Sequence, residues 1–380
     1  MQTILIVDDD ETLVEGLAGL LERPGRKLIL CGDLESAQVV VEEEIPTCVV
    51  TDVRLSGPFR YEGLDFISQV KRLSANTTVV VITGAATEGL TSEALKRGAV
   101  AVIEKPFETA KLAAYLPEPT DGEESCVVRF PSIDQVIRSP LLVPVFQPIV
   151  DLSVPGGATV HGYESLARFE GTPLSNPVTL FEYASRKGRL VDLEVACVRG
   201  TLRLGAALAA TAKLFINVHP AVLASGELEP ALTRALKEAC VPASRIVLEI
   251  TEQSSIGDSA LVEMRCSALR KLGFSFALDD VGMAYSHLTH IERIRPLYLK
   301  VSQDFGTAFE ADRTRTKIVK NVLSLARDFE CELILEGIES ASTRDAARDL
   351  GIRFGQGYFF ARPSSAADCR HTSIGEGVAL

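Results

Sequence analysis

The chain has 380 residues, of which 46% are hydrophobic and 24% are charged, and its formal net charge is −12. This balance predicts a globular protein with a sizeable core and argues against global disorder. The negative charge, without any basic run, argues against partnership with DNA or with an anionic membrane surface.

The first 115 residues alternate between short β-rich runs and stretches with helical spacing. The expected strands are residues 4–7, 27–30, 48–51, 78–83 and 100–104. Helical patterns lie between them, as in residues 12–22 and 34–44. Strands that alternate with helices predict an α/β fold with a doubly wound, five-stranded parallel sheet.

A polar, proline-rich stretch with the sequence PEPTDGEES follows at residues 117–125 and predicts a linker. The alternation then resumes, with candidate strands at residues 143–149, 159–166, 213–218, 245–250, 274–279, 297–301, 332–337 and 355–360. Eight strands over roughly 240 residues predict a modified (βα)8, TIM-like barrel. We therefore expect a first domain at 1–116, a linker at 117–130, a barrel at 131–370 and a tail at 371–380.

Polar residues stand where the strands of the first domain end. They are Asp8, Asp9, Asp52, Thr83 and Lys105. Ligands bind at the carboxyl ends of the strands in such a sheet, and three carboxylates there favour a hard cation such as Mg2+. A metal, a carboxylate nucleophile and a lysine suit the formation of an aspartyl-phosphate. For the Asp-Asp-Asp run alone, the alternative is a helix N-terminus with Asp10 as its N-cap.

The stretches ILIVDDDE, VVTDVRLSG, VVVITGA and VIEKPF resemble the receiver domain of bacterial two-component response regulators. The resemblance implies that a sensor histidine kinase provides the phosphoryl group for Asp52. It also implies that Asp8, Asp9 and the Arg54 carbonyl hold one Mg2+, while Thr83 and Lys105 contact the phosphoryl group.

Two features depart from the receiver pattern. The loop at residues 56–63 is longer than usual, and Val102 stands where receivers commonly carry a switching tyrosine or phenylalanine. We therefore expect phosphorylation of Asp52 without the usual threonine–aromatic relay.

Polar residues also close successive strands of the predicted barrel. They are Glu164, Asn217, Glu249, Asp279 with Asp280, Lys300, Glu336 and Gln356. The C-terminal ends of barrel strands carry the chemistry of this fold, and acids crowded there need cations between them. All-oxygen ligands favour Mg2+ or Mn2+, and the adjacent Asp279 and Asp280 predict a pair of ions. Such a site suits phosphodiester hydrolysis, in which Lys300 steadies the attacking water and Glu336 accepts a proton.

Eight ordered motifs over residues 130–365 resemble the EAL-domain phosphodiesterases. They are FQPIV, GYESLAR, FINVHP, LEITE, LDDVGMAYSHL, LYLKV, ILEGIES and GQGYFFARP. The resemblance implies hydrolysis of the bacterial messenger cyclic di-GMP to linear pGpG. It makes metal ligands of Glu164, Asn217, Glu249, Asp279 and Asp280.

The same resemblance assigns the remaining site residues. Lys300 and Glu336 become the water-activating pair, and Gln356 supports the waters of the metal site. Gln147 and Arg168 become substrate contacts, together with Gln356. Glu252 becomes the anchor of the loop after Asp280.

The sequence departs from the EAL pattern at Val281, Met283, Ala284 and Ser302, where the family carries other residues, including an aspartate at the position of Ser302. Asp304 lies nearby. Two functions therefore stay open: a cyclic di-GMP phosphodiesterase of weak or full activity, and a module that binds cyclic di-GMP or a protein partner without turnover. A third, an unrelated metal-dependent barrel acting on sugars or carbon acids, fits the acids but not the ordered motifs.

The wider expectations concern assembly and location. Without a DNA-binding module, the barrel is the expected output, controlled by phosphorylation of Asp52 in a homodimer or higher oligomer. The eight scattered cysteines predict small buried side chains in a reducing cytoplasm, and no apolar run predicts a signal peptide or a membrane-spanning helix.

Overall fold

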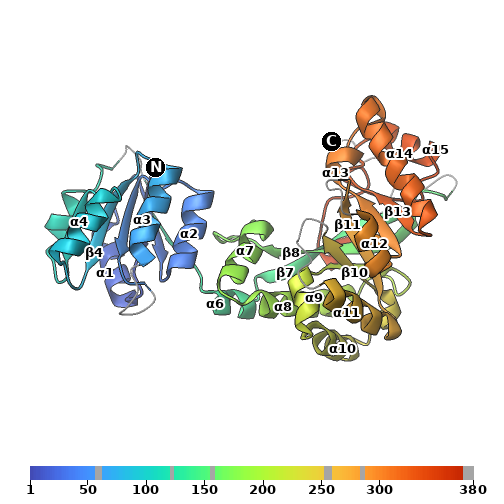
Figure 1. Ribbon diagram of the computed structural model, residues 1–380, viewed down its shortest axis with the longest axis horizontal. Coiled ribbons are helices and arrows are strands. Elements are labelled where there is room, and N and C mark those ends of the chain that lie inside the picture. The colour runs from blue at the N-terminus through green and yellow to red at the C-terminus, as the bar shows by residue number, and fades with distance from the viewer. Residues whose placement is uncertain (56–61, 120–123, 155–158, 252–258, 283–286, 371–380) are drawn as a thin grey trace. The chain divides into compact units, whose positions relative to one another are not determined.

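The computed structural model describes residues 1–55, 62–119, 124–154, 159–251, 259–282 and 287–370. The chain divides into two compact units (Figure 1). The first contains Met1–Ser139 and Phe169–Arg189, and the second contains Pro140–Arg168 and Leu190–Leu380. No helix in the described part of the chain is both long and apolar enough to span a membrane.

The first unit is built on a parallel sheet. Its strands are β1 (Gln2–Val7), β2 (Arg26–Cys31), β3 (Cys48–Asp52), β4 (Thr78–Thr83), β5 (Ala101–Glu104) and β6 (Cys126–Arg129). They pair in the order β5-β4-β3-β1-β2-β6, and every pair is parallel. The doubly wound sheet is as predicted, but it has six strands and not five. The additional strand, β6, lies in the span predicted as a linker and pairs with β2.

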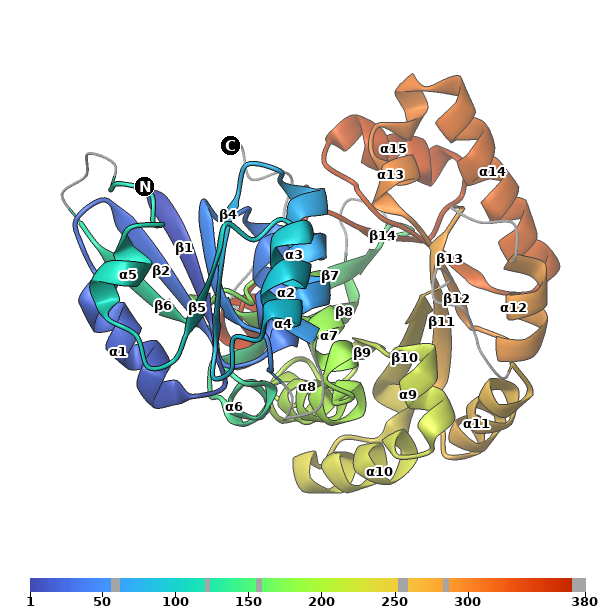
Figure 2. The ribbon, with the colours of Figure 1, turned by 60° about the vertical axis from the view of Figure 1, so that its left-hand side comes forward.

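Helices cover both faces of this sheet. They are α1 (Glu11–Leu21), α2 (Leu34–Glu43), α3 (Glu62–Leu73), α4 (Glu88–Lys96) and α5 (Thr109–Ala113), while α6 (Ile133–Arg138) and α7 (Pro177–Arg186) complete the unit. Figure 2 shows α1 and α5 on one face and α2, α3 and α4 on the other. The sequence explains α1: Asp10 caps it by accepting from two backbone N–H groups, and Val14, Leu17 and Leu21 recur at helical spacing on its buried face.

The second unit is a closed eight-stranded barrel. Its strands are β7 (Leu142–Asp151), β8 (Thr159–Phe169), β9 (Lys213–Asn217), β10 (Ile246–Thr251), β11 (Ser275–Val281), β12 (Tyr298–Val301), β13 (Glu332–Leu335) and β14 (Phe354–Gln356). Neighbouring strands from β8 to β14 are parallel, whereas β14 and β7 run antiparallel. This reversed strand is the modification of the (βα)8 plan.

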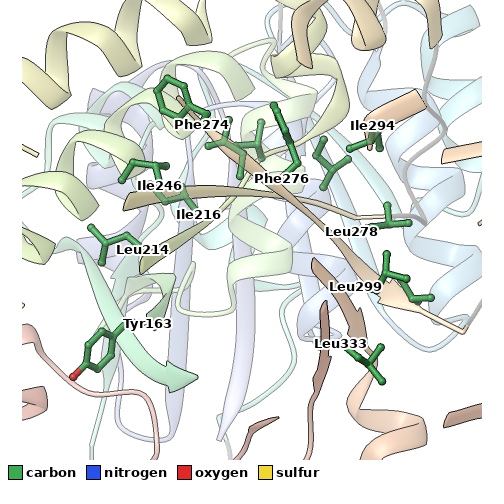
Figure 3. Packing of buried hydrophobic residues seen from close by; sticks show 14 of the residues in the cluster. Tyr163, Leu214, Ile216, Ile246, Phe274, Phe276, Leu278, Ile294, Leu299 and Leu333 are labelled. Carbon is green, nitrogen blue, oxygen red and sulfur yellow. The ribbon is translucent and has the colours of Figure 1, made fainter. Parts of the chain in front are cut away.

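The barrel is surrounded by helical segments. They are α8 (Leu190–Gly205), α9 (Pro220–Ser225), α10 (Leu228–Ala239), η1 (Ala243–Arg245), α11 (Ser259–Lys271), α12 (His287–Ile294), α13 (Gln303–Gly306), η2 (Phe309–Ala311), α14 (Arg313–Asp328), α15 (Ala341–Asp349) and α16 (Ala366–Cys369). The largest core cluster lies between strands and helices, where residues such as Ile246, Phe276 and Leu299 pack together (Figure 3).

A separate apolar cluster takes one residue from each of seven barrel strands. Its members are Ile149, Phe215, Val247, Ala277, Tyr298, Ile334 and Phe354. Side chains on a strand alternate between faces, so these residues form a layer on the inner face of the barrel, opposite the helix-facing cluster. This layer closes the barrel interior below the site.

Candidate active site

The polar residues of the barrel form the layer directly above the inner apolar layer. On β9 to β14, a polar residue lies two positions after each member of the apolar layer. These polar residues are Asn217, Glu249, Asp279, Lys300, Glu336 and Gln356. On the antiparallel strand β7, Gln147 stands two residues before Ile149. Because the side-chain period of a strand is two, the same register that builds the apolar floor gathers these polar groups.

Lys300 is the centre of this layer, with 0% of its surface exposed. Its Nζ lies 2.8 Å from Glu336 Oε1, 3.0 Å from Glu249 Oε1, 3.3 Å from Asp279 Oδ1 and 3.4 Å from Glu164 Oε2. Burial alone would lower the pKa of Lys300, but the surrounding carboxylates raise it well above its usual value. The lysine is therefore a fixed positive charge at neutral pH.

One ammonium group does not balance the surrounding acids. Burial raises the pKa of Glu249 well above its usual value, raises that of Asp279, and raises that of Glu336 to about 8. Burial acts on Glu164 in the same direction, but Lys300 and hydrogen bonds from Gln356 and Asn217 outweigh it and lower the pKa. The raised values express an excess of negative charge that protons or metal cations must neutralise.

The geometry offers two overlapping groups of metal-binding oxygens. One oxygen each from Glu164, Glu249 and Asp279 lie within 4.8 Å of one another, and so do oxygens from Asp279, Asp280 and Glu336. These five carboxylates and Lys300 carry a net charge of −4, which two divalent cations would neutralise. Oxygen-only donors and a shared carboxylate fit Mg2+ or Mn2+.

A bulge explains how two adjacent acids serve one site. The register between β11 and β12 shifts between Leu278 and Val281, and Asp280 has a left-handed φ of 56°. Neighbouring residues of a regular strand point to opposite faces, whereas a bulge redirects a side chain. Both carboxylates can thus join the same group of oxygens. The Asp280 N–H also donates to Asp279 Oδ1 at 3.0 Å.

Amide side chains hold Glu164 in place. Gln356 Nε2 donates to Glu164 Oε2 at 2.6 Å and to Gln147 Oε1 at 3.0 Å, and Asn217 Nδ2 donates to Glu164 Oε1 at 3.0 Å. Arg168 lies four residues beyond Glu164 on β8 and therefore on the same face of that strand. The structure thus brings together the predicted barrel residues other than Arg168, which lies farther along β8, and Glu252, which lies outside the described residues.

A second lysine–carboxylate group lies at the strand ends of the first unit. Lys105 Nζ lies 2.6 Å from Asp8 Oδ2 and 2.7 Å from Asp52 Oδ2. Burial raises the pKa of Asp8. Burial would lower the pKa of Lys105, but its hydrogen bonds to Asp52 and Asp8 raise it. The nucleophile and the cation of the predicted phosphorylation site are therefore in contact.

The remaining predicted residues flank this group. The Arg54 N–H donates to Asp52 Oδ1 at 3.0 Å, and Thr83 ends β4 with its side chain buried. Asp9 is exposed beside Asp8. The strand order places β1, β3 and β4 side by side, with β5 beyond them, so all these groups share one edge.

A family model described as the EAL domain matches residues 132–363, which is more than half of the chain. The chain belongs to the EAL family. A second family model, the response regulator receiver domain, matches residues 4–117. The acidic barrel is thus the EAL domain, and the Asp52 site lies in a receiver domain.

Two curated relatives are similar to this chain. Cyclic di-GMP phosphodiesterase RocR of Pseudomonas aeruginosa is 26% identical over 390 residues, covering 95% of each chain. "Probable cyclic di-GMP phosphodiesterase PdeG" of Escherichia coli is 29% identical over 242 residues, covering 62% of this chain but 47% of PdeG. The likeness to RocR therefore includes both domains, whereas the chain spans less than half of PdeG.

Solved structures support the barrel assignment. A standalone EAL protein from Vibrio cholerae O395, in a form with c-di-GMP bound, has a TM-score of 0.52 and 27% identity. The alignment covers 59% of this chain and 93% of that structure. This extent agrees with a complete EAL barrel in the present chain.

The structure also describes part of the unusual EAL sequence. Ser302 is buried and caps α13, where its hydroxyl accepts from the Asp304 N–H at 3.5 Å. Asp304 is exposed and belongs to neither group of metal-binding oxygens in the described part of the chain. It therefore does not replace an aspartate at position 302. Met283 and Ala284 lie outside the described residues.

One buried acid of the EAL domain was not predicted from the sequence. Glu194 lies on the inner face of α8, among Leu193, Val198 and Leu202. Its signal was available, because an acid on an otherwise apolar helical face predicts a buried polar contact. The bulge at Asp280 has no comparable local signal.

Proposed function

We propose that the EAL domain is a phosphodiesterase that uses Mg2+ or Mn2+ to hydrolyse cyclic di-GMP to linear pGpG. The observation that carries the proposal is the pair of overlapping carboxylate groups that share Asp279 around Lys300. The names of RocR and PdeG support the substrate. The near-complete coverage of RocR supports the same combination of domains.

The carboxylates and amides would hold the cations and the substrate. Glu164, Asn217, Glu249, Asp279 and Asp280 are the proposed metal ligands, and Gln147, Arg168 and Gln356 are the proposed substrate contacts. Divalent cations bound there would polarise the phosphodiester and lower the pKa of the attacking water. Hydrolysis adds this water to phosphorus and breaks one P–O bond of the ring.

Lys300 and Glu336 would manage the proton of this reaction. The lysine Nζ lies 2.8 Å from Glu336 Oε1 and holds that carboxyl at the mouth of the barrel. Burial raises the pKa of Glu336, and cations bound beside it would lower that pKa again, so that its carboxylate could accept the proton of the water. Glu336 is therefore the proposed proton acceptor, and Lys300 steadies the water and the developing negative charge.

The receiver domain would regulate this reaction in the cytoplasm. A sensor histidine kinase is the proposed phosphoryl donor for Asp52, with Asp8, Asp9 and the Arg54 carbonyl holding Mg2+. Thr83 and Lys105 would contact the phosphoryl group. We further propose a homodimer or higher homo-oligomer, which light scattering of the purified chain would test.

Turnover of cyclic di-GMP is the direct test. The purified chain is incubated with the nucleotide and Mn2+ or Mg2+, and the product is separated by chromatography. We expect linear pGpG, and we expect Glu164→Ala to abolish it. Exposed Glu238→Ala on α10 is the matched control. Metal-independent turnover, or full activity of the Glu164 variant, would refute the proposed site.

A second candidate function is a module that binds cyclic di-GMP without turnover. Ser302 favours it, because its buried hydroxyl caps α13 and the exposed Asp304 supplies no carboxylate in its place. Calorimetry with cyclic di-GMP and Ca2+ measures binding separately from hydrolysis. Binding without pGpG at high protein concentration would establish the module.

A further inference from the structure

Glu194 is a buried acid outside the proposed catalytic set. It lies near the start of α8 and is 3% exposed. Burying a carboxylate among apolar side chains is costly unless it gains hydrogen bonds. Burial accordingly raises the pKa of Glu194 to about 8. A helix that packs on the barrel could carry leucine here at lower cost, so the contact made by this acid needs an explanation.

Within the described part of the chain, Glu194 makes one hydrogen bond, and its partner lies at the active-site end of the barrel. Its Oε1 accepts from the backbone N–H of His219 at 2.9 Å, whereas its Oε2 is buried without a partner among the described residues. His219 stands two residues after Asn217, at the turn between β9 and α9. The acid therefore holds the turn that leaves the strand end of a proposed metal ligand.

The turn is fixed from both sides. The Val218 N–H donates to the Glu249 carbonyl of β10 at 2.8 Å, and the next N–H, of His219, donates to Glu194. Asn217 itself has an exposed side chain whose Nδ2 reaches Glu164. Without the acceptor from α8, the Val218 N–H would keep its hydrogen bond to β10, but the His219 N–H would lose its partner.

The same helix also touches β8 beside Glu164. Thr201 lies seven residues after Glu194, two turns along the same face of α8, and its Oγ1 lies 2.6 Å from Ser165 Oγ. Both residues are buried. Helix α8 thus makes a polar contact close to each of the two ligands, Glu164 and Asn217, that hydrogen-bond to each other.

We propose that Glu194 is a positioning residue for the metal site, which it serves by fixing the β9–α9 turn and hence Asn217. The proposal rests on the proposed metal-dependent function. Outer groups that orient metal ligands typically contribute about 10- to 100-fold to metal affinity. Loss of the acceptor should therefore weaken cation binding more than it weakens the fold.

The test compares Glu194→Gln with Glu194→Met in the full chain. The two side chains are similar in size, but only glutamine keeps an oxygen that can accept from the His219 N–H. We expect the Met variant to bind Mn2+ about 10- to 100-fold more weakly in calorimetry and the Gln variant to stay near wild type. Hydrolysis by the Met variant should recover when Mn2+ is raised. If that variant does not fold, Glu194→Asp, one methylene shorter, takes its place.

Val198→Ala is the matched control, because it creates a cavity on the same buried face of α8 without changing a hydrogen bond. It should lower the melting temperature and leave the Mn2+ dissociation constant unchanged. Equal Mn2+ affinity in wild type and the Met variant, or equal weakening in the Gln, Met and Val198 variants, would overturn the positioning role. Failure of wild type itself to bind Mn2+ would instead refute the proposed function.

Discussion

The two domains each place a lysine among carboxylates, but they do so at different depths. Lys105 of the receiver bridges Asp8 and Asp52, and 24% of its side chain is exposed. Lys300 of the barrel touches four carboxylates and is fully buried. Water can screen the charges around Lys105, whereas the charges around Lys300 are compensated only by the polar groups that surround them.

The difference shows how far each site depends on added cations. In the receiver, Asp8, Asp9, Asp52 and Lys105 carry a net charge of −2, which one divalent ion would balance. The barrel carries −4 at greater burial, where each uncompensated charge costs more. We therefore expect the barrel to depend more strongly than the receiver on cations for both function and stability.

The largest effect is expected from Asp279→Asn, because Asp279 belongs to both groups of metal-binding oxygens. Hydrolysis of cyclic di-GMP should fall by more than about 100-fold, as a charged ligand is lost from two sites at once. Rates at saturating Mn2+ provide the measurement, with exposed Asp328→Asn on α14 as control. Residual activity within tenfold of wild type would contradict the shared-ligand assignment.

Removing each lysine tests whether the more deeply buried site depends more strongly on its lysine for stability. Lys300→Met leaves buried acids without their cation and should cost about 3–5 kcal/mol of unfolding free energy in EDTA. Lys105→Met should cost less, because its site is partly exposed. Denaturant unfolding, followed separately for the transition of each domain, measures both losses of free energy. Equal losses in the two variants would show that burial does not distinguish the sites.

Metal removal should also lower the stability of the barrel, but by a smaller amount. Mn2+ at 100 times its dissociation constant should stabilise the barrel by about 2.7 kcal/mol per ion relative to EDTA, because it binds the folded site. Thermal unfolding across a Mn2+ titration reports this gain. The Asp279→Asn variant should lose most of it. A gain that this variant retains in full would place the binding elsewhere.

Glu194 extends the comparison to a buried acid with no lysine. Its pKa is raised by burial to about 8 in the folded state, above its ordinary value near 4.5. Its favourable contribution is therefore present at low pH and is lost as pH rises through this window. Relative to Glu194→Gln, wild type should lose up to about 1.4 kcal/mol per pH unit between these values. Parallel stability curves for the two proteins would show that Glu194 keeps an ordinary pKa.

The smallest expected effect concerns regulation. An acyl phosphate such as acetyl phosphate should change the turnover rate of wild type by at least about fivefold, a typical size for coupling between sites. Asp52→Asn should remove this response, because it removes the phosphoryl acceptor while the barrel stays intact. If acetyl phosphate labels Asp52 but leaves the rate unchanged, the receiver does not control hydrolysis.

The architecture could be predicted because it depends on local periodicity. Alternating apolar runs mark most strands, and the polar residue that ends each run falls at the mouth of the sheet or barrel, as Glu249 and Lys300 do. The acid cluster followed from those positions. The assignments of individual roles remain predictions, and Glu252 lies outside the described residues.

The unpredicted features depend on tertiary pairing. Strand β6 has only four residues, CVVR, and it forms because β2 offers an unpaired edge. The bulge at Asp280 depends on the register with β12, which no local pattern contains. Glu194 stands on an apolar face of α8, but its hydrogen-bond partner, the His219 N–H, follows a strand that no local pattern places beside this helix. In each case the deciding partner is distant along the chain.

Strand β6 also changes which strands form the two edges of the sheet in the first unit. Lys27–Leu30 already bond to Cys126–Arg129, and Arg129 makes a bidentate ion pair with Glu15 of α1. Among the described strands of this sheet, β5 and β6 are the two edge strands, and each retains one unpaired side. Another polypeptide could therefore extend the sheet at either edge, and at the β6 edge it would lie close to α6, because residues 130–132 are the whole span between that strand and the helix.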